Sequence, residues 1–267
     1  MRSDADLSKL VNQSGFPLQL AIDRLIQDRS DDLGWKVVYR EHGWKNPDGQ
    51  SGFADLVLED RFGTSVLVVE CKRVMEADWI FLEESSAKPL SRLTRLWATN
   101  TPNHGREHSG YYDARALPES RESMFCVVAG QDPKSRPMLE RVAAETTAAM
   151  EAIAIEEHPV ITKRGYGLRM YVPVIVTTAR LVSSRIDPTL VALNSGEASA
   201  VAHEVLPWIR FRKQFSSEYA VEPREPEWDF SELAAAKEKL VYVVNVNSFA
   251  EFLEKWSVTD NSLRALM

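Results

Sequence analysis

The sequence predicts a mixed α/β domain in which helices flank a central sheet. Helical and strand-like segments alternate along most of the 267 residues, a pattern typical of helices packed on a sheet. Runs rich in β-branched residues, such as 66–69, predict buried strands. The Ala-, Glu- and Met-rich segment 137–158 predicts a long helix. With 44% hydrophobic and 27% charged residues, the chain has the composition of a globular protein with a large core.

The first part of the chain predicts one helix followed by three strands. Residues before Phe16 are polar, and we expect them to be loosely held. After Pro17, apolar residues recur at positions 18, 22, 25 and 26, which is helical spacing, and Gly34 suits the end of that helix. Strands are then predicted at 35–42, 55–58 and 66–72.

The rest of the chain is less regular until its last third. Residues 83–97 predict a helix, and 101–123 predict a loop. Pro173 indicates an edge position or a bulge in its strand. Ser248 is the expected N-cap of a short terminal helix. The remaining elements are a buried strand at 124–130, the long helix from Pro137, and strands at 168–181 and 239–249.

Composition narrows the class of protein. Cys71 and Cys126 lie in apolar, strand-like runs, so we expect buried, reduced thiols rather than a disulfide. The N-terminus lacks a long apolar signal segment, and no run approaches the ~18 apolar residues of a membrane-spanning helix. A cytoplasmic protein without a membrane partner is therefore expected. The net charge of -7 argues against a broad electrostatic grip on nucleic acid, so a polyanion would require a local basic groove or a divalent metal.

The stretch 55–72 carries the clearest chemistry. Asp55 opens one strand, and Glu70 and Lys72 close the next, so a hairpin brings both carboxylates to one end of a sheet. Side-chain alternation places Glu70 and Lys72 on one face and Cys71 on the other. Carboxylate oxygens and the backbone carbonyl of Cys71 suit Mg²⁺ or Mn²⁺, and Lys72 would orient a water or neutralise a phosphate. Taken alone, a Glu and a Lys two residues apart are equally typical of a solvated ion pair.

In its context, this stretch resembles the PD-(D/E)XK nuclease superfamily. That family places an Asp on the second strand and (D/E)-x-K on the third strand of a meander that follows a core helix. Asp55 and Glu70-Cys71-Lys72 match these positions, and Ala54 stands in place of the Pro in the motif's name. The specific resemblance covers about residues 15–82 and is architectural beyond them.

The resemblance implies a restriction-endonuclease-like fold: a mixed central sheet flanked by helices, with additional C-terminal strands. It implies a single domain over residues 1–267. The core would cover about 15–180, with an insertion at about 73–123 and a C-terminal extension at about 181–267.

The resemblance also implies an activity. The expected protein is a Mg²⁺-dependent (or Mn²⁺-dependent) endonuclease or exonuclease that acts on DNA rather than RNA. Asp55, Glu70 and the carbonyl of Cys71 would bind the metal, and Lys72 would assist catalysis. Such proteins often act as homodimers, and many serve in bacterial restriction or antiphage defence. The alternatives are a catalytically inactive nuclease-like nucleic-acid-binding or regulatory module and an RNA-directed nuclease.

Position 19 departs from the family. The helix beginning GFPLQ resembles the first helix of restriction-endonuclease-like proteins, in which an acid often follows Phe-Pro-Leu, whereas this chain has Gln19. Asp23, one helical turn later, is the candidate substitute. Gln19 and Asp23 would either support the metal site or form an ordinary polar helix surface.

Basic and aromatic residues offer further contacts to nucleic acid. Two groups are candidates in particular: Arg92 and Arg95, with Arg106 nearby, and Lys134, Arg136 and Arg141 at the start of the long helix. A third group is Arg210, Arg212 and Lys213, and each group could also be a solvated face. His42 and Trp44 flank a turn that would either pack on the surface or stack on nucleic acid. His104 and His108 have zinc-like spacing, but without a third ligand nearby we expect no zinc site.

Overall fold

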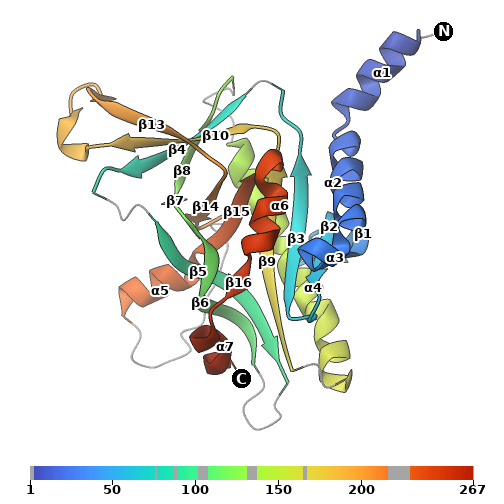
Figure 1. The fold of residues 1–267 in the computed structure, drawn as a ribbon. Coiled ribbons are helices and arrows are strands. Elements are labelled where there is room, and N and C mark those ends of the chain that lie inside the picture. The colour runs from blue at the N-terminus through green and yellow to red at the C-terminus, as the bar shows by residue number, and fades with distance from the viewer. Residues whose placement is uncertain are drawn as a thin grey trace.

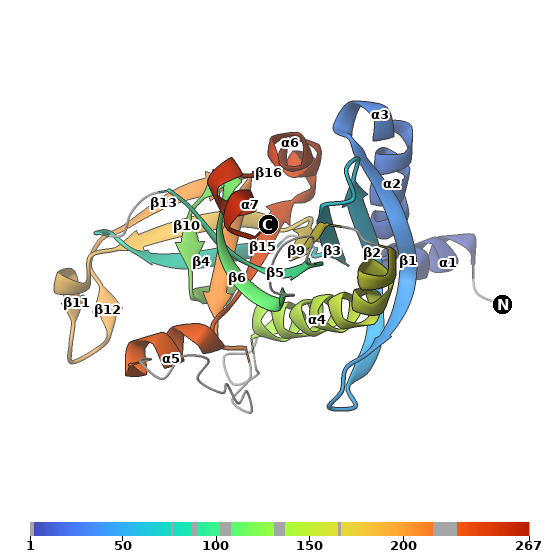
Figure 2. The ribbon, with the colours of Figure 1, turned by 90° about the horizontal axis from the view of Figure 1, so that it is seen from below.

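The computed structural model describes residues 3–75, 77–86, 90–101, 108–130, 137–164, 167–215 and 229–266. It has an α/β architecture, with mixed sheets flanked by helices. In Figure 1 the helices α2 and α6 lie over one face of the main sheet, and Figure 2 shows α4 across the opposite face. No helix among the described residues is long and apolar enough to cross a membrane.

Seven α-helices and sixteen strands are assigned within the described residues. The helices are α1 (Asp4–Gln13), α2 (Phe16–Asp28), α3 (Ser30–Leu33), α4 (Met138–Arg164), α5 (Phe230–Lys237), α6 (Phe249–Lys255) and α7 (Asp260–Leu266). The first eight strands are β1 (Trp35–Lys45), β2 (Ser51–Asp60), β3 (Ser65–Lys72), β4 (Asp78–Glu84), β5 (Ser91–Asn100), β6 (His108–Ser120), β7 (Glu122–Ser123) and β8 (Phe125–Val128). The others are β9 (Leu168–Thr177), β10 (Arg180–Ile186), β11 (Val191–Ala192), β12 (Glu197–Ala198), β13 (Val201–Leu206), β14 (Trp208–Lys213), β15 (Lys239–Asn245) and β16 (Ser257–Val258). Two short 3₁₀ helices are η1 (Pro188–Leu190) and η2 (Val246–Ser248).

The main sheet has ten strands, and its central path runs β1-β2-β3-β9-β15-β14-β7. The strands β1, β2 and β3 form an antiparallel meander, whereas β3, β9 and β15 run parallel. Strand β5 also pairs with β9, and β5 joins β6 and β16 to the sheet. A second sheet has the order β13-β10-β4-β8, and β11 pairs with β12. The expected core and the expected C-terminal extension, which begins at about residue 181, therefore contribute strands to the same central sheet.

Three apolar clusters hold these layers together. One lies between the sheet and the helices α2 and α6, and includes Ile22, Leu67 and Phe252. The second lies between the sheet and the middle of α4, and includes Val68 and Ile153. The third joins the first turns of α4 to the second sheet. Because successive residues of a strand face opposite sides, the unbroken apolar run at 66–69 can serve two clusters at once.

Most of the expected elements are confirmed. The helix after Pro17 forms as α2 and α3, and Gly34 ends it with a φ of 70°. The meander, the long helix α4, β15 and α6 lie where the sequence predicted them. The apolar positions expected on the buried face of α4 are buried: Leu139, Val142, Ala143, Ala149, Met150 and Ile153.

The segment between β3 and α4 was predicted wrongly. Residues 83–97, expected as a helix, fall largely in the strands β4 and β5, and the loop expected at 101–123 includes β6. The residues Thr94, Leu96 and Ala98 of β5 are all buried, which is strand alternation. Pairing of β5 with β6 and β9 outweighs the helical preference of its Leu and Arg residues.

Pro173 does not mark an edge strand, because β9 lies in the middle of the sheet between β3 and β15. On one side Pro173 pairs with Val68 of β3. On the other side β5 pairs with β9 up to Tyr171, and β15 begins to pair at Val174. Pro173 therefore lies at the junction between two neighbouring strands, where its missing N–H interrupts no ladder on that side.

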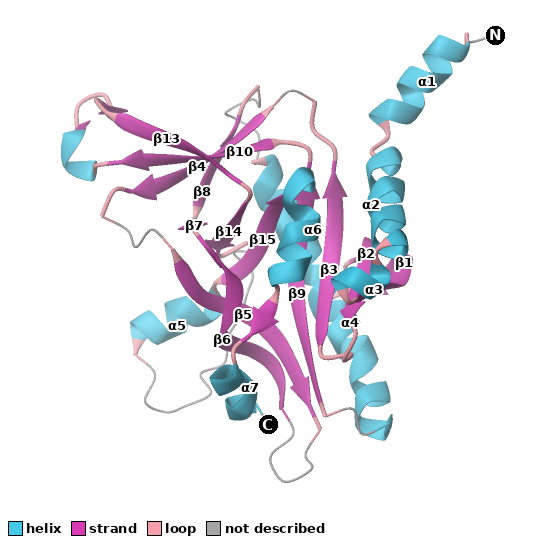
Figure 3. Cartoon of the chain, viewed as in Figure 1, coloured by secondary structure: helices cyan, strands magenta, loops and turns pink. Residues whose placement is uncertain are grey.

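Three smaller predictions are corrected in part by the structure. Residues before Phe16 form the helix α1, which begins with a capping box at Ser3 and buries none of its side chains. Strand β8 exists, but Phe125 is 56% exposed, and Cys126 is only partly buried. Ser248 occupies the N-cap position of α6 without a capping hydrogen bond from its side chain. Figure 3 shows α1 projecting from the start of α2, away from the sheets.

Candidate metal site at the open end of a hairpin

The hairpin of β2 and β3 brings Asp55 and Glu70 together, as the sequence predicted. The register pairs Leu56 with Val69, so Asp55 and Glu70 are the next residues on the two strands. The ladder ends there, and the carboxylate Oδ2 of Asp55 instead accepts a hydrogen bond from the backbone N–H of Cys71 at 2.7 Å. The carboxylate of Asp55 therefore lies where the two strands separate.

Strand alternation fixes the directions of the next three residues. Cys71 is buried in the cluster beneath α2 and α6, whereas Glu70 and Lys72 are partly exposed. The carbonyl of Lys72 accepts a hydrogen bond from the N–H of Thr178, on the β9 side. The N–H and C=O of one strand residue point the same way, so the carbonyl of Cys71 is directed to the Asp55 side. Two carboxylates and one carbonyl thus converge on the gap between the strands.

The electrostatics of this site favour a cation. Burial raises the pKa of the Asp55 carboxyl, and the charge of Glu41 raises it further. The hydrogen bond from Cys71 and the charge of Lys72 lower this pKa, but they do not outweigh the other two effects. Burial and the neighbouring charge of Asp55 raise the pKa of Glu70 to about 7, with Glu145 and Glu41 contributing. Lys72 opposes these shifts only in part. Negative charge therefore exceeds positive charge at this end of the hairpin.

Gln19 and Glu41 complete the surroundings of Asp55. Gln19 is only 9% exposed, and its amide donates to the carboxylate of Glu41 at 2.7 Å and to the carbonyl of Asp55 at 3.1 Å. Glu41 has a φ of 45°, which is uncommon for a residue other than glycine. The sequence interpretation missed Glu41. Its position on β1, between the residues paired with Leu56 and Ala54, is the feature that would have placed it beside Asp55.

Asp23 is placed differently from Gln19. Its carboxylate receives two hydrogen bonds from Arg40, both at 2.8 Å. These hydrogen bonds lower the pKa of Asp23 against the effect of its burial. Asp23 does not contribute to the raised pKa values of Asp55 and Glu70. The structure therefore brings Gln19 to the site and leaves Asp23 in an ion pair one turn away.

The donor set fits a hydrated Mg²⁺ or Mn²⁺ better than a metal enclosed by protein ligands. Within the described ranges, no group of three or more His, Cys, Asp or Glu side chains is arranged to hold a metal ion. Mg²⁺ usually binds one or two carboxylates and keeps several waters, so Asp55, Glu70 and the carbonyl of Cys71 satisfy its requirements. Zinc, which favours closed sets of nitrogen and sulfur ligands, does not fit.

Most of the basic candidates are held in ion pairs. Arg92 lies 2.6 Å from Glu119, and Arg95 lies 3.6 Å from Asp113 while it also donates to backbone carbonyls of α5. Arg141 lies 3.4 Å from Glu145 on the same helix. The third group is paired as well: Arg210 and Arg212 with Glu122, and Lys213 with Glu140. Lys134, Arg136, Arg106 and His104, together with the side chain of His108, lie outside the described residues.

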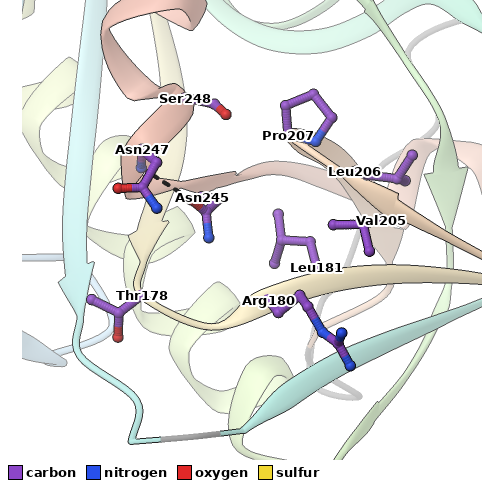
Figure 4. Close-up of a pocket in the computed structure, with 9 residues that line it drawn as sticks. All are labelled: Thr178, Arg180, Leu181, Val205, Leu206, Pro207, Asn245, Asn247 and Ser248. Atoms are coloured by element: carbon purple, nitrogen blue, oxygen red, sulfur yellow. Dashed lines mark hydrogen bonds between the residues drawn. The ribbon is translucent and has the colours of Figure 1, made fainter.

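A separate hollow lies at the carboxyl ends of β9 and β15, and Figure 4 shows its lining. Its volume is about 450 Å³, and its polar wall includes Arg180, Asn245 and Asn247. Arg180 forms an ion pair with Asp78. The side-chain amide of Asn245 donates a hydrogen bond to the carbonyl of Ala179 and accepts one from the backbone N–H of Asn247. At the edge of the hollow, the hydroxyl of Thr178 forms hydrogen bonds with the backbone N–H and carbonyl of Val74, two residues after the end of β3. These bonds fix the chain that leaves Lys72.

Comparison with known proteins gives no match: no protein-family model, no curated protein and no solved structure is similar to this chain. The function is therefore inferred from the residues and geometry of the chain itself.

Proposed function

We propose that this protein is a Mg²⁺-dependent nuclease that hydrolyses phosphodiester bonds, with DNA as the favoured substrate. One observation carries the proposal: Asp55 and Glu70 form a partly buried pair of carboxylates with raised pKa values at the open end of the β2–β3 hairpin. The order α2, β1, β2, β3, with Asp55 and Glu70-Cys71-Lys72 on the last two strands, supports a restriction-endonuclease-like fold. A cytoplasmic location, action as a homodimer and a role in restriction or antiphage defence belong to the same proposal.

Each residue has a distinct role in this proposal. Asp55, Glu70 and the carbonyl of Cys71 hold the metal. A bound Mg²⁺ would polarise the phosphodiester and lower the pKa of a coordinated water. Lys72 lies on the same face of β3 as Glu70, where its ammonium would neutralise charge on the phosphate or orient the attacking water.

Gln19 and the hydrogen bond from Cys71 position Asp55. The amide of Gln19 holds the backbone of Asp55, and the N–H of Cys71 holds its carboxylate. Both contacts fix the carboxylate before any ligand binds, which reduces the cost of ordering the site. Glu41 is kept close to Asp55 by the same amide.

Cleavage assays test the proposal directly. Plasmid, linear DNA and RNA are incubated with the wild type, Asp55→Ala and Lys72→Ala in Mg²⁺, Mn²⁺ or EDTA. We expect wild-type cleavage that requires the metal and falls about 10²- to 10⁴-fold in both variants, because each removes a group that acts on the reacting phosphate or its metal. Lys36→Ala is the matched control, since Lys36 lies on the neighbouring β1 and pairs with Glu59. Wild-type rates no higher than those of Asp55→Ala would refute nuclease activity.

A catalytically inactive nuclease-like module is the second candidate. The observation that favours it is the pairing of Arg92, Arg95 and Arg141 with carboxylates, which reduces the positive charge that these three residues offer to a duplex. Calorimetric titration with Mg²⁺ and Mn²⁺ separates the two candidates. Metal binding that disappears in Glu70→Ala would count against the inactive module.

A further inference from the structure

The helix α1 forms although it buries none of its side chains. It has 10 residues and begins with a capping box at Ser3, and in Figure 3 it projects from the start of α2. Isolated helices shorter than ~12–15 residues are marginal in water, and most helices in proteins are stabilised by packing of an apolar face. A short, capped helix without such packing therefore points to a surface outside this copy of the chain that covers it.

An apolar stripe runs along one side of α1. Leu7, Leu10 and Val11 have the spacing i, i+3 and i+4, which places them on one face of the helix. The first two turns of α2 add Phe16 and Leu20, four residues apart. The exposed fractions of these five side chains lie between 44% and 67%. Large apolar side chains thus face solvent along α1 and the start of α2.

The charged side chains at the two ends of α1 have opposite signs. Asp4 and Asp6 lie in the first turn, one on either side of the apolar stripe. At the other end, the guanidinium of Arg73 donates a hydrogen bond to the carbonyl of Asn12. In the part of the chain that the structure describes, neither acid forms an ion pair, and Arg73 has no carboxylate partner. The apolar stripe therefore lies between an acidic end and a basic end.

This arrangement is complementary to a second copy of itself. In a two-fold antiparallel pair of α1 helices the two stripes face each other, and the first turn of each helix lies beside the last turn of the other. Asp4 and Asp6 of one copy then approach Arg73 of the other copy, and the symmetry repeats this contact. Burying the apolar side chains of both copies would remove on the order of 1,000 Å² from water, which a specific interface requires. An anionic membrane fits less well, because it would repel the two acids.

We propose that two copies of this chain associate through α1, as an antiparallel pair of α1 helices. The inference rests on the homodimer of the proposed function and assigns a surface to it. The last turn of α1 lies close to the candidate metal site, because Arg73, which bonds to Asn12, directly follows Lys72. The dimer would therefore hold one candidate metal site on each side of its two-fold axis, so that each site can act on one strand of a duplex.

Light scattering across a dilution series measures this association. The wild type should be a dimer, and Leu7→Ser/Val11→Ser should raise its dissociation constant at least ~100-fold, because both apolar contacts are lost in each copy. The matched control is Lys9→Ser, on the opposite side of α1, which should leave the dimer unchanged. Since α1 buries none of its side chains, the Leu7→Ser/Val11→Ser monomer should still unfold cooperatively, which circular dichroism checks.

A charge exchange tests the antiparallel orientation. Arg73→Glu alone should weaken the dimer about tenfold, because the new carboxylate faces Asp4 and Asp6 of the other copy. Asp4→Lys/Arg73→Glu should regain affinity, because the attraction returns with its signs reversed. A double variant that dissociates as readily as Arg73→Glu would overturn the antiparallel pairing of α1.

The other outcomes separate this inference from the nuclease proposal. A monomeric wild type, or a dimer that Leu7→Ser/Val11→Ser leaves intact, would overturn the inference. So would binding of the wild type to phosphatidylserine–phosphatidylcholine vesicles that this variant loses, because the stripe would then cover a lipid surface. If the wild type is a monomer that cleaves DNA, the nuclease proposal survives and the α1 interface fails. If the dimer depends on α1 and no cleavage occurs, the interface survives and the nuclease proposal fails.

Discussion

The two ends of the β2–β3 hairpin contain similar groups in opposite states. One end has Asp55, Glu70 and Lys72, and the other has Glu59 with the Glu157 and Arg169 that pack against it. The closed end has two cations for two carboxylates, because Lys36 also pairs with Glu59. The open end has Lys72 alone beside Asp55, Glu70 and the neighbouring carboxylate of Glu41. Only the second end compensates its charges completely.

At the closed end, Arg169 is the centre of a hydrogen-bond network. Its guanidinium donates to Glu157 at 2.7 Å, to Glu59 at 2.6 Å and to the carbonyl of Gly63 at 3.1 Å. The hydroxyl of Tyr171 also donates to Glu157, at 2.6 Å. Burial alone would raise the pKa of Glu59, but the hydrogen bonds from Arg169 and Lys36 outweigh it and lower the pKa. The ion pairs and hydrogen bonds at this end therefore stabilise the fold.

At the open end, no ion pair neutralises the carboxylates of Asp55 and Glu70 within the residues that the structure describes. Burial and mutual repulsion raise both pKa values instead. Charged groups cost free energy when they are desolvated without a partner, so this end weakens the fold. Groups that reduce stability in this way are frequent at functional sites, and a divalent cation would provide the missing charge.

Breaking the closed end should have the largest effect on stability. Arg169→Met keeps the side-chain volume but removes the guanidinium that pairs with Glu157 and Glu59. Glu59 then retains only its exposed partner Lys36. We expect a loss of about 3–5 kcal/mol in the free energy of unfolding, measured with urea. Arg180→Met is the control, because Arg180 pairs with Asp78 on the exposed surface. A loss in Arg169→Met no larger than in this control would show that the closed end is not the stabilising one.

Neutralising the open end should increase stability in EDTA. The pKa of Glu70 is about 7 in the folded chain, against 4.5 for an ordinary Glu. Between these values the folded state retains a proton that the unfolded state releases, so wild-type stability falls as the pH rises through this window. At pH 8 we expect Glu70→Gln to be more stable than the wild type by about 1–3 kcal/mol, with the difference shrinking towards pH 4.5.

Thermal unfolding at several pH values measures this difference in stability. Glu59→Gln should change the stability in the opposite direction. The pKa of Glu59 is lowered, so its contribution is present above its unfolded pKa and is lost as the pH falls. Glu59→Gln should therefore destabilise the protein at pH 8. Added Mg²⁺ should stabilise the wild type and leave Glu70→Gln unchanged. A Glu70→Gln variant less stable than the wild type at pH 8 in EDTA would contradict the assignment of an uncompensated open end.

Removing the support of Asp55 should have a smaller effect. Gln19→Met deletes the donors to Glu41 and to the carbonyl of Asp55, and we expect a loss of about 1–2 kcal/mol in stability. The affinity for Mg²⁺ should fall about tenfold, because an outer hydrogen bond that orients a ligand is lost. Calorimetric titration checks the affinity, with Gln27→Met on the exposed side of the same helix as control. Equal Mg²⁺ affinities in the two variants would remove Gln19 from the site.

The smallest effect is expected at Asp23. Asp23→Asn weakens an ion pair with Arg40 whose guanidinium is well exposed, so we expect a stability change of about 0.2–1 kcal/mol and no change in Mg²⁺ affinity. The same unfolding and titration experiments apply. A clear loss of Mg²⁺ affinity in Asp23→Asn would make Asp23 the supporting acid instead of Gln19.

Several features of the site could be predicted from the sequence because they depend on near neighbours. The turn at 61–63 sets the hairpin, and alternation along β3 then separates Glu70 and Lys72 from Cys71. The long helix α4 followed from composition and helical spacing. In contrast, β5 was misassigned because its partners, β6 and β9, lie elsewhere in the chain, and only their pairing reveals its alternation.

The sequence by itself determined the order of α2, β1, β2 and β3 and the meeting of Asp55 with Glu70. Both depend on hydrogen bonds and alternation within one short stretch. Only the tertiary structure decided which charges are compensated. It brings Arg169 of β9 to Glu59, and it places Gln19 of α2 between Glu41 and Asp55. The physical reason is that burial and electrostatic coupling depend on distance in space, and the residues that set them are separated by up to 110 positions in the chain.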